Sequence, residues 1–232
     1  MKNLILAAAL AWLVAACQPA EVDPAFDEDA ASGRLAEYEA ARANGDFEIA
    51  EAHGNTLRQR HGETAAATQV RRTLDEVRAG AEEMRETRRL RGLWEYQSIP
   101  TGNGTQHTAA IYSRVPSAPE GEVAPTPDAR LILRRHPDWG ESAYLVLTQR
   151  KLECRPPCAL QIRFDEGEPQ RFAGEPADTG TGPALFIKDR DRFLAALREA
   201  RQVRIEIPSS GALVPMFEFE VGGFSPAWHL AD

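Results

Sequence analysis

The N-terminal third of the chain spaces its apolar residues at helical intervals. From residue 32 to about residue 92 the sequence is rich in Ala, Glu and Arg and contains no proline, a composition that favours helix. Two short stretches, around Gly45 and Gly62, interrupt the pattern. We therefore predict three helices, at about residues 32–44, 46–60 and 63–91. Asp46 is placed to cap the second of them.

The third predicted helix has the most regular apolar spacing. Positions three and four apart form one stripe, made of Ala67, Val70, Leu74, Val77, Ala81 and Met84. Such a stripe predicts that the helix packs on the first two helices. The alternative is that the stripe is a seam for a partner or for a second copy of the chain.

After Leu93 the period changes to that of β-strands. Alternation or short apolar runs predict strands at residues 107–114, 130–135, 142–149, 158–164, 184–187, 203–207 and 216–221. Gly- and Pro-rich loops separate several of these segments. One helix is predicted from its cap at Asp189 to about Ala200.

The alternation also assigns side chains to the two faces of the sheet. Within 130–135, Arg130 and Arg134 lie on the face opposite Leu131. Short strands joined by turns, with one helix, indicate an antiparallel sandwich or an open barrel. The predicted fold class is α+β and multidomain: an N-terminal three-helix segment, then a mostly antiparallel β-sandwich with one helix.

Residues 1–16 are typical of a secretory signal. Lys2 precedes an apolar run that is too short to span a bilayer. The residues Val14-Ala15-Ala16-Cys17 resemble the lipobox of bacterial lipoproteins, which implies that Cys17 is lipidated and begins the mature chain. In that family, Gln18 rather than Asp at the next position implies the outer membrane, with the protein facing the periplasm. The alternative is an ordinary cleaved signal with a chance cysteine.

These patterns divide the chain into four segments. The signal peptide covers residues 1–16, and an acidic, proline-bearing tether covers 17–31. A helical region follows at 32–92, and a β-rich domain with a disulfide hairpin occupies 93–232.

The remaining cysteines, Cys154 and Cys158, flank two prolines. Disulfides persist in an oxidising compartment, so we predict that this pair closes a small loop, a constraint worth about 2 kcal/mol. The spacing is not the C-x-x-C of redox sites, and the sequence offers no further cysteine pair for structural zinc. Redox and metal roles remain the alternatives, and we expect no metal and no cofactor.

The net charge of -8, without a basic stripe, argues against binding to nucleic acid. It also argues against peripheral binding to anionic lipid, so the N-terminal lipid must hold the protein at the membrane.

Two segments resemble known families. Gly45-Asp46-Phe47-x-x-Ala50, with Leu57 further on, resembles one tetratricopeptide-type hairpin, which implies a helical scaffold. Residues 130–228 are similar to secreted β-sandwich proteins of bacterial envelopes, among them invasion-associated protein B and the accessory lipoproteins of type VI secretion. The matching features are the CxxxC pair with its following strand, Phe164-Asp165-x-Gly167, the Phe193-Leu194 helix, and Phe217-Glu-Phe219-x-Val221-x-Gly223. This second resemblance implies a location and a fold, and no catalytic residue.

The sequence contains no complete catalytic motif, so no catalytic residue is predicted. Arg135, His136 and Trp139 lie in a short basic, acidic and aromatic segment, residues 134–142. Because exposed Trp and Arg are common binding anchors, the segment is a candidate recognition loop. The alternative is a turn whose Trp139 covers the end of the sandwich.

The preferred hypothesis is a non-enzymatic, membrane-anchored envelope lipoprotein that acts as an accessory or protein-interaction component. Its partner would be another envelope protein that the sequence does not identify. The alternatives are a periplasmic hydrolase that uses the 134–142 segment, and a carrier of a small ligand in a sandwich cavity.

Overall fold

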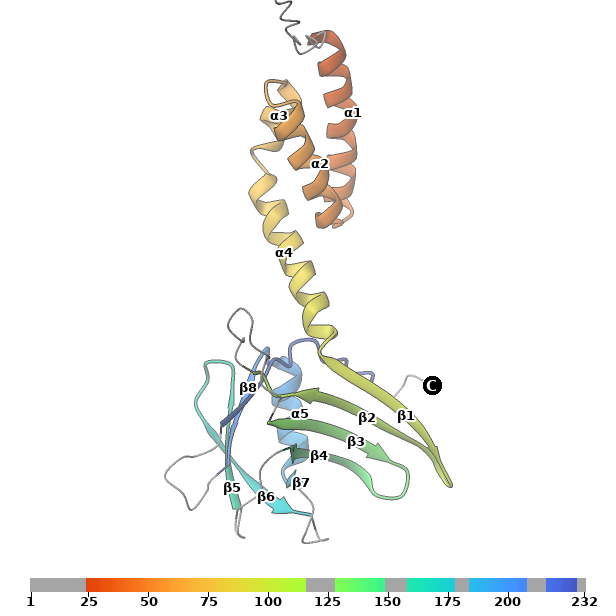
Figure 1. The fold of residues 1–232 in the computed structure, drawn as a ribbon, viewed down its shortest axis with the longest axis vertical. Coiled ribbons are helices and arrows are strands. Elements are labelled where there is room, and N and C mark those ends of the chain that lie inside the picture. Colours follow the sequence, from red (N-terminus) through yellow and green to blue (C-terminus); the bar gives the residue numbers. More distant parts are fainter. Residues whose placement is uncertain (1–23, 116–127, 149–157, 178–183, 208–215, 229–232) are drawn as a thin grey trace, which may run out of the picture. The chain divides into compact units, whose positions relative to one another are not determined.

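The computed structural model describes residues 24–115, 128–148, 158–177, 184–207 and 216–228 (Figure 1). The chain forms two compact units, Met1–Ala81 and Glu82–Asp232. Helices in the N-terminal part are followed by a nine-stranded antiparallel sheet and one further helix. The predicted α+β class is therefore confirmed.

Helices account for all the regular structure described in the first unit. They are α1 (Pro24–Ala43), α2 (Phe47–Arg60), α3 (Ala65–Val70) and the beginning of α4 (Leu74–Arg91). Helix α1 starts within the segment 17–31 that the sequence interpretation assigned to a tether. Asp46 occupies the N-cap position of α2, as predicted, but its side chain makes no capping hydrogen bond.

The single helix predicted over 63–91 is in fact two helices. Thr64 caps α3, because its Oγ1 accepts the N–H of Ala67 at 3.2 Å. At the break, the N–H of Thr73 donates to the carbonyl of Val70 three residues earlier. The Thr73 hydroxyl shares a 2.7 Å hydrogen bond with the Tyr38 hydroxyl of α1. The spacing of apolar residues along the helix gives no sign of this tertiary contact.

The apolar stripe predicted on the third helix does face the core of the first unit. Its first five members are buried, whereas Met84 is exposed.

Close packing explains two glycines in the helices of the first unit. A Cβ at Gly54 would come within 2.7 Å of Leu74, and a Cβ at Gly80 would come within 2.6 Å of the Phe47 ring. Both glycines allow neighbouring side chains to approach helix backbone directly.

The nine strands of the described residues belong to one continuous sheet in the order β1-β2-β3-β4-β7-β6-β5-β8-β9, with every neighbouring pair antiparallel. Their bounds are β1 Trp94–Thr101, β2 Gly104–Tyr112, β3 Ala129–His136, β4 Gly140–Leu147, β5 Cys158–Phe164, β6 Gln170–Pro176, β7 Ala184–Ile187, β8 Val203–Glu206 and β9 Met216–Phe219. Strands β5 and β7 have the predicted bounds. Strands β1 and β6 were not predicted.

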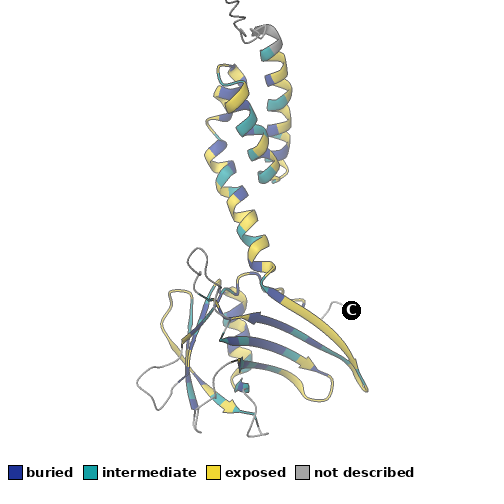
Figure 2. Ribbon diagram, viewed as in Figure 1, coloured by how far each residue is buried: buried dark blue, intermediate teal, exposed yellow. Residues whose placement is uncertain are grey.

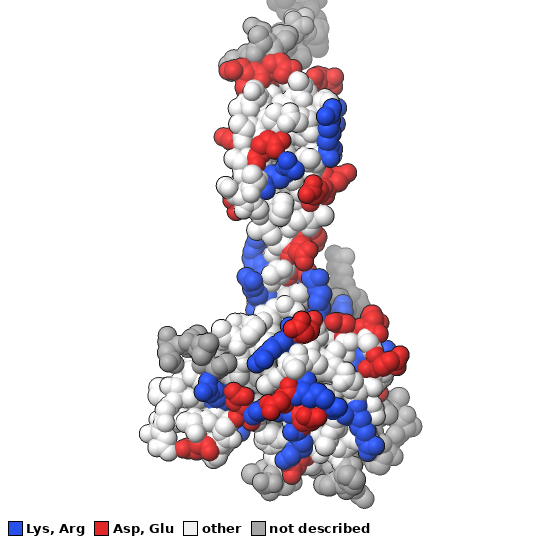
Figure 3. Space-filling view, turned by 180° about the vertical axis from the view of Figure 1, so that it is seen from behind, with Lys and Arg blue, Asp and Glu red and all other residues white. Residues whose placement is uncertain are grey.

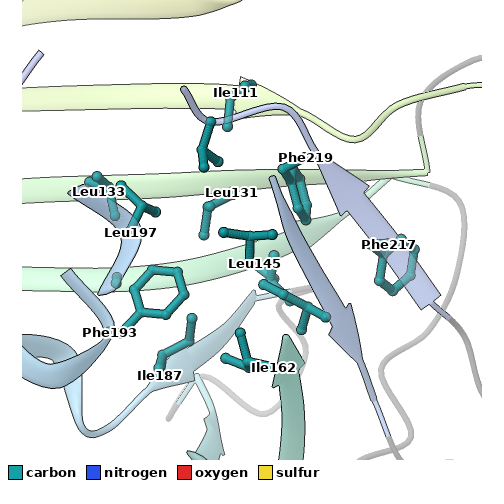
Figure 4. Packing of buried hydrophobic residues seen from close by; sticks show 14 of the residues in the cluster. Ile111, Leu131, Leu133, Leu145, Ile162, Ile187, Phe193, Leu197, Phe217 and Phe219 are labelled. Atoms are coloured by element: carbon teal, nitrogen blue, oxygen red, sulfur yellow. The ribbon is translucent and has the colours of Figure 1, made fainter. Parts of the chain in front are cut away.

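The sheet folds over so that its two halves share one core. Leu131 and Leu145, from β3 and β4, lie in the same buried cluster as Phe217 and Phe219 of β9 (Figure 4). Helix α5 (Arg190–Glu199) adds Phe193 to this cluster. The arrangement is sandwich-like, as predicted, although hydrogen bonding runs through β7 without a gap.

Asp189 occupies the N-cap position of α5, as predicted, but its side chain makes no capping hydrogen bond. Its carboxylate instead lies 2.9 Å from Nε of Arg192.

Strand β1 differs from the other strands because it is almost wholly exposed after Trp94 (Figure 2). The C-terminal segment holds its first residues in place. Trp94 Nε1 donates to the carbonyl of Val221 at 3.3 Å, and the N–H of Ser225 donates to the Tyr96 hydroxyl at 2.9 Å. These contacts fix the start of the sheet.

Candidate functional site

The candidate recognition loop forms the tip of the hairpin between β3 and β4. The turn is closed locally, since the N–H of Asp138 donates to Nδ1 of His136 at 3.1 Å, and Gly140 takes a positive φ of +68°. The neighbouring β1–β2 turn supports it, because Nδ2 of Asn103 donates to Oδ1 of Asp138 at 2.7 Å. Two adjacent hairpin tips are thus hydrogen bonded to each other.

Trp139 is the most exposed large apolar side chain described, at 69%. Its ring stacks on the ring of His136, with centroids 3.9 Å apart and an interplanar angle of 15°. His136 is itself only 7% exposed. The Arg134 guanidinium also lies over the Trp139 ring, 5.3 Å from its centroid. The indole is therefore exposed to solvent but supported from the protein side.

The three candidate residues are only partly brought together. His136 and Trp139 are in contact, but Arg135 is paired in register with Glu141 and lies on the opposite face from its neighbour Arg134. The cation beside Trp139 is thus Arg134. Strand alternation placed Arg134 on the outer face, but its contact with Trp139 depends on the turn.

Sequence reasoning missed that this tip continues into a longer surface. On the outer face of β2, β3 and β4, arginines alternate with aromatic and apolar side chains. We call this surface the outer-face stripe, composed of Tyr112, Arg130, Ile132, Arg134, Tyr144 and Trp139. Finding it from sequence would have required the register between strands.

Contacts between arginine side chains and aromatic rings order the outer-face stripe. The Arg130 guanidinium lies 5.1 Å from the centroid of Tyr112, and that of Arg134 lies 5.5 Å from the centroid of Tyr144. Ile132 is only 8% exposed although it faces outward, and it lies between Arg130 and Arg134 on β3 and across from Tyr144 on β4. Burial raises the pKa of the Tyr144 phenol, and the two arginines oppose that shift. The stripe is thus an ordered surface.

Three buried polar atoms on this face have no hydrogen-bond partner in the part of the chain that the structure describes. They are Nε of Arg130, Nε of Arg134 and Oγ of Ser142. Arg134 and Ser142 are cross-strand neighbours in register. Because Oγ of Ser142 is unpartnered, it is not hydrogen bonded to His136, so the described geometry holds no Ser–His pair at the 134–142 segment.

A cleft of about 420 Å³ lies beside Ser142, where β4, β6 and β7 meet the start of α5. Its lining carries four acidic and two basic side chains, and both basic groups are already paired. Lys188 pairs with Glu175, and Nη1 of Arg190 lies 3.7 Å from the Glu141 carboxylate. A ligand would have to separate these pairs.

The space between the two halves of the sheet is occupied by packed apolar side chains (Figure 4), which gives the carrier hypothesis no support.

Two predicted site residues, Cys17 and Cys154, lie outside the described residues, so the lipidation and the disulfide remain predictions. Cys158 begins β5 and is buried. It is paired in register with Gly174, where a Cβ would lie 2.9 Å from the Cys158 sulfur. The glycine therefore provides the space that this sulfur occupies.

The residues that the structure describes contain no group of three His, Cys, Asp or Glu side chains that could hold a metal ion. Within the same residues, no helix has both the length and the apolar character needed to cross a bilayer. On the face shown in Figure 3, basic and acidic side chains are interleaved and form no large patch of one sign.

Comparison with known proteins assigns no family. No family model matches the chain, and no curated protein matches it. Among solved structures, the crystal structure of invasion associated protein b from Bartonella henselae aligns with a TM-score of 0.39 and 13% sequence identity, over 60% of this chain and 90% of that chain. The same protein was named in the sequence resemblance, but a likeness this weak supports no argument about function.

Proposed function

We propose that the protein is a lipid-anchored, non-enzymatic interaction component of a bacterial outer membrane, facing the periplasm and docking another envelope protein. The observation behind the docking role is the supported exposure of Trp139. A large apolar ring that is 69% exposed is costly to leave in water. Trp and Arg are also the residues that most often dominate the binding energy of protein interfaces.

The support beneath Trp139 strengthens this proposal. A side chain that is already held by His136 and Arg134 loses little conformational freedom on binding, so more of its contact energy becomes affinity. The hydrogen bond from Asn103 to Asp138 fixes the turn in the same way. The tip is therefore pre-organised for contact.

The membrane anchor in this proposal is the lipid on Cys17, and it is supported by the N-terminal sequence alone. A Cys17→Ser variant is expected to lose incorporation of radiolabelled palmitate and to leave the membrane fraction. Retention of both the label and the membrane association would contradict the lipid anchor.

The docking role is tested by a photocrosslinking amino acid placed at position 139 of the full chain in cells. Met216, which is 56% exposed in the same unit, is the matched control position. We expect one dominant crosslinked protein from position 139 that is absent from position 216. No adduct, or the same adducts at both positions, would contradict docking through this tip.

A further inference from the structure

We infer that the outer-face stripe binds an extended, acidic segment of the partner protein, with a carboxylate of that segment on Arg134. This inference rests on the proposed function, since it specifies the chemistry of the partner that docks near Trp139. It is based on the charge, burial and spacing of the stripe.

The two arginines of the stripe differ in their charge partners. Arg130 forms an ion pair with Glu95. Arg134 has no carboxylate partner within the described residues, and its Nε is buried without an acceptor. In a chain with 35 acidic and 27 basic residues, a half-buried arginine without an acidic partner leaves part of its binding capacity unused.

The setting of Arg134 favours a carboxylate as the missing partner. The guanidinium lies over two rings, Trp139 and Tyr144. Since Nε is buried, the Nη atoms at the end of the group are the donors that a ligand can reach. Two parallel donors match the two oxygens of a carboxylate, and the adjacent rings exclude water from that contact.

The length and ends of the stripe favour an extended segment over an isolated anion. From Arg130 to His136 the outer face of β3 covers about 20 Å, which matches about six residues of extended chain. The aromatic side chains near its two ends, Tyr112 and Trp139, are both exposed. A segment with apolar side chains on either side of an acidic residue would contact both rings and Arg134.

Other anionic partners fit this surface less well. The stripe has two arginines, one of them already paired, which is far fewer cations than nucleic-acid binding requires. The net charge of -8 opposes binding to anionic lipid surfaces. An acidic protein segment needs only one well-placed cation.

The test uses the full chain in detergent and a fluorescently labelled random copolymer of glutamate and tyrosine, with the lysine–tyrosine copolymer as the opposite-charge probe. Fluorescence anisotropy is expected to show binding of the acidic copolymer alone. Arg134→Gln should weaken that binding about tenfold or more, as expected for a lost charged hydrogen bond. Arg198→Gln is the matched control, because it removes the same charge from the exposed end of α5, and it should leave binding unchanged.

Arg134→Lys keeps the charge and removes the two parallel donors, so it should also weaken binding, and it replaces Arg134→Gln if that variant does not fold. Equal effects of Arg134→Gln and Arg198→Gln, or equal binding of both copolymers, would overturn the inference, as would no binding of the acidic copolymer. If the copolymer test fails while the adduct at position 139 persists, only the acidic-segment inference falls. If that adduct is also absent, the proposed docking role falls with it.

Discussion

Gly223 lies directly against the backbone of Leu90: a Cβ at position 223 would be 2.2 Å from the Leu90 carbonyl carbon. No rotation of a side chain can relieve a contact with backbone. Position 223 must therefore be glycine for the C-terminal segment to pack against the end of α4.

We expect Gly223→Ala to lower the free energy of unfolding by about 1–3 kcal/mol or more, as overpacking does. Urea denaturation of the full chain measures this change. Gly102→Ala is the control, because a Cβ there meets nothing within 4 Å. Equal stabilities of the two variants would contradict the close contact.

Gly80 and Gly33 both lie in helices, but their substitution by alanine should change the free energy of unfolding in opposite directions. Alanine at Gly33 meets nothing within 4 Å, so its better helix propensity should raise stability by up to about 1 kcal/mol. Alanine at Gly80 would press on the Phe47 ring at 2.6 Å, so we expect a net loss of about 1–2 kcal/mol. Thermal unfolding followed by circular dichroism compares them, and a gain in both would show that Phe47 moves aside.

Glu218 of β9 accepts hydrogen bonds from Arg114 at 3.0 Å and from Arg204 at 3.1 Å. These groups are partly exposed, so we expect Glu218→Gln to cost only about 1 kcal/mol, and less at high salt. Urea denaturation at low and high salt measures both effects. Glu206→Gln, on the neighbouring strand, is the control with the same charge change. A loss that does not depend on salt would contradict an electrostatic role.

Burial raises the pKa of the Tyr96 and Tyr144 phenols above their ordinary value of 10.0. The folded state then holds these protons more tightly than the unfolded state, so their contribution is complete below pH about 10 and falls as the pH rises beyond it. We expect the alkaline loss of stability to be smaller in Tyr144→Phe than in the parent chain. Urea denaturation over an alkaline pH series measures this, and identical pH profiles would contradict the prediction.

The predicted disulfide between Cys154 and Cys158 should be visible to thiol chemistry. A maleimide reagent is expected to label neither cysteine in the unfolded chain before reduction and both after it, as read by mass spectrometry. Cys154→Ser should then lower stability by about 2 kcal/mol because the unfolded chain is less constrained. Labelling of both thiols without a reductant would contradict the disulfide.

The local pattern of the sequence predicted the elements whose burial alternates. Strand β5 has its predicted bounds because Leu160 and Ile162 face the core and the chain turns at Asp165, which has a positive φ of 49°. Strand β1 could not be found in this way, since only its first residue is buried. The break before α4 was missed because it involves the hydrogen bond between the Thr73 and Tyr38 hydroxyls.

Part of the candidate site was also predicted from the local pattern of the sequence. Alternation placed Arg130 and Arg134 on one face, and composition drew attention to Trp139. The stack of Trp139 on His136 depends on the turn geometry, and the contact of Arg134 with Tyr144 depends on strand register. Neither can be obtained from residue types along a single strand.

The contact between the C-terminal segment and the end of α4 has a consequence for how this unit is assembled. Arg89 and Glu220 pair across 131 positions of sequence, and Gly223 closes on Leu90 a few residues later. Closing so long a loop is entropically costly and slow. The β-rich unit therefore reaches its native state only once residues 220–223 are available to close on the end of α4.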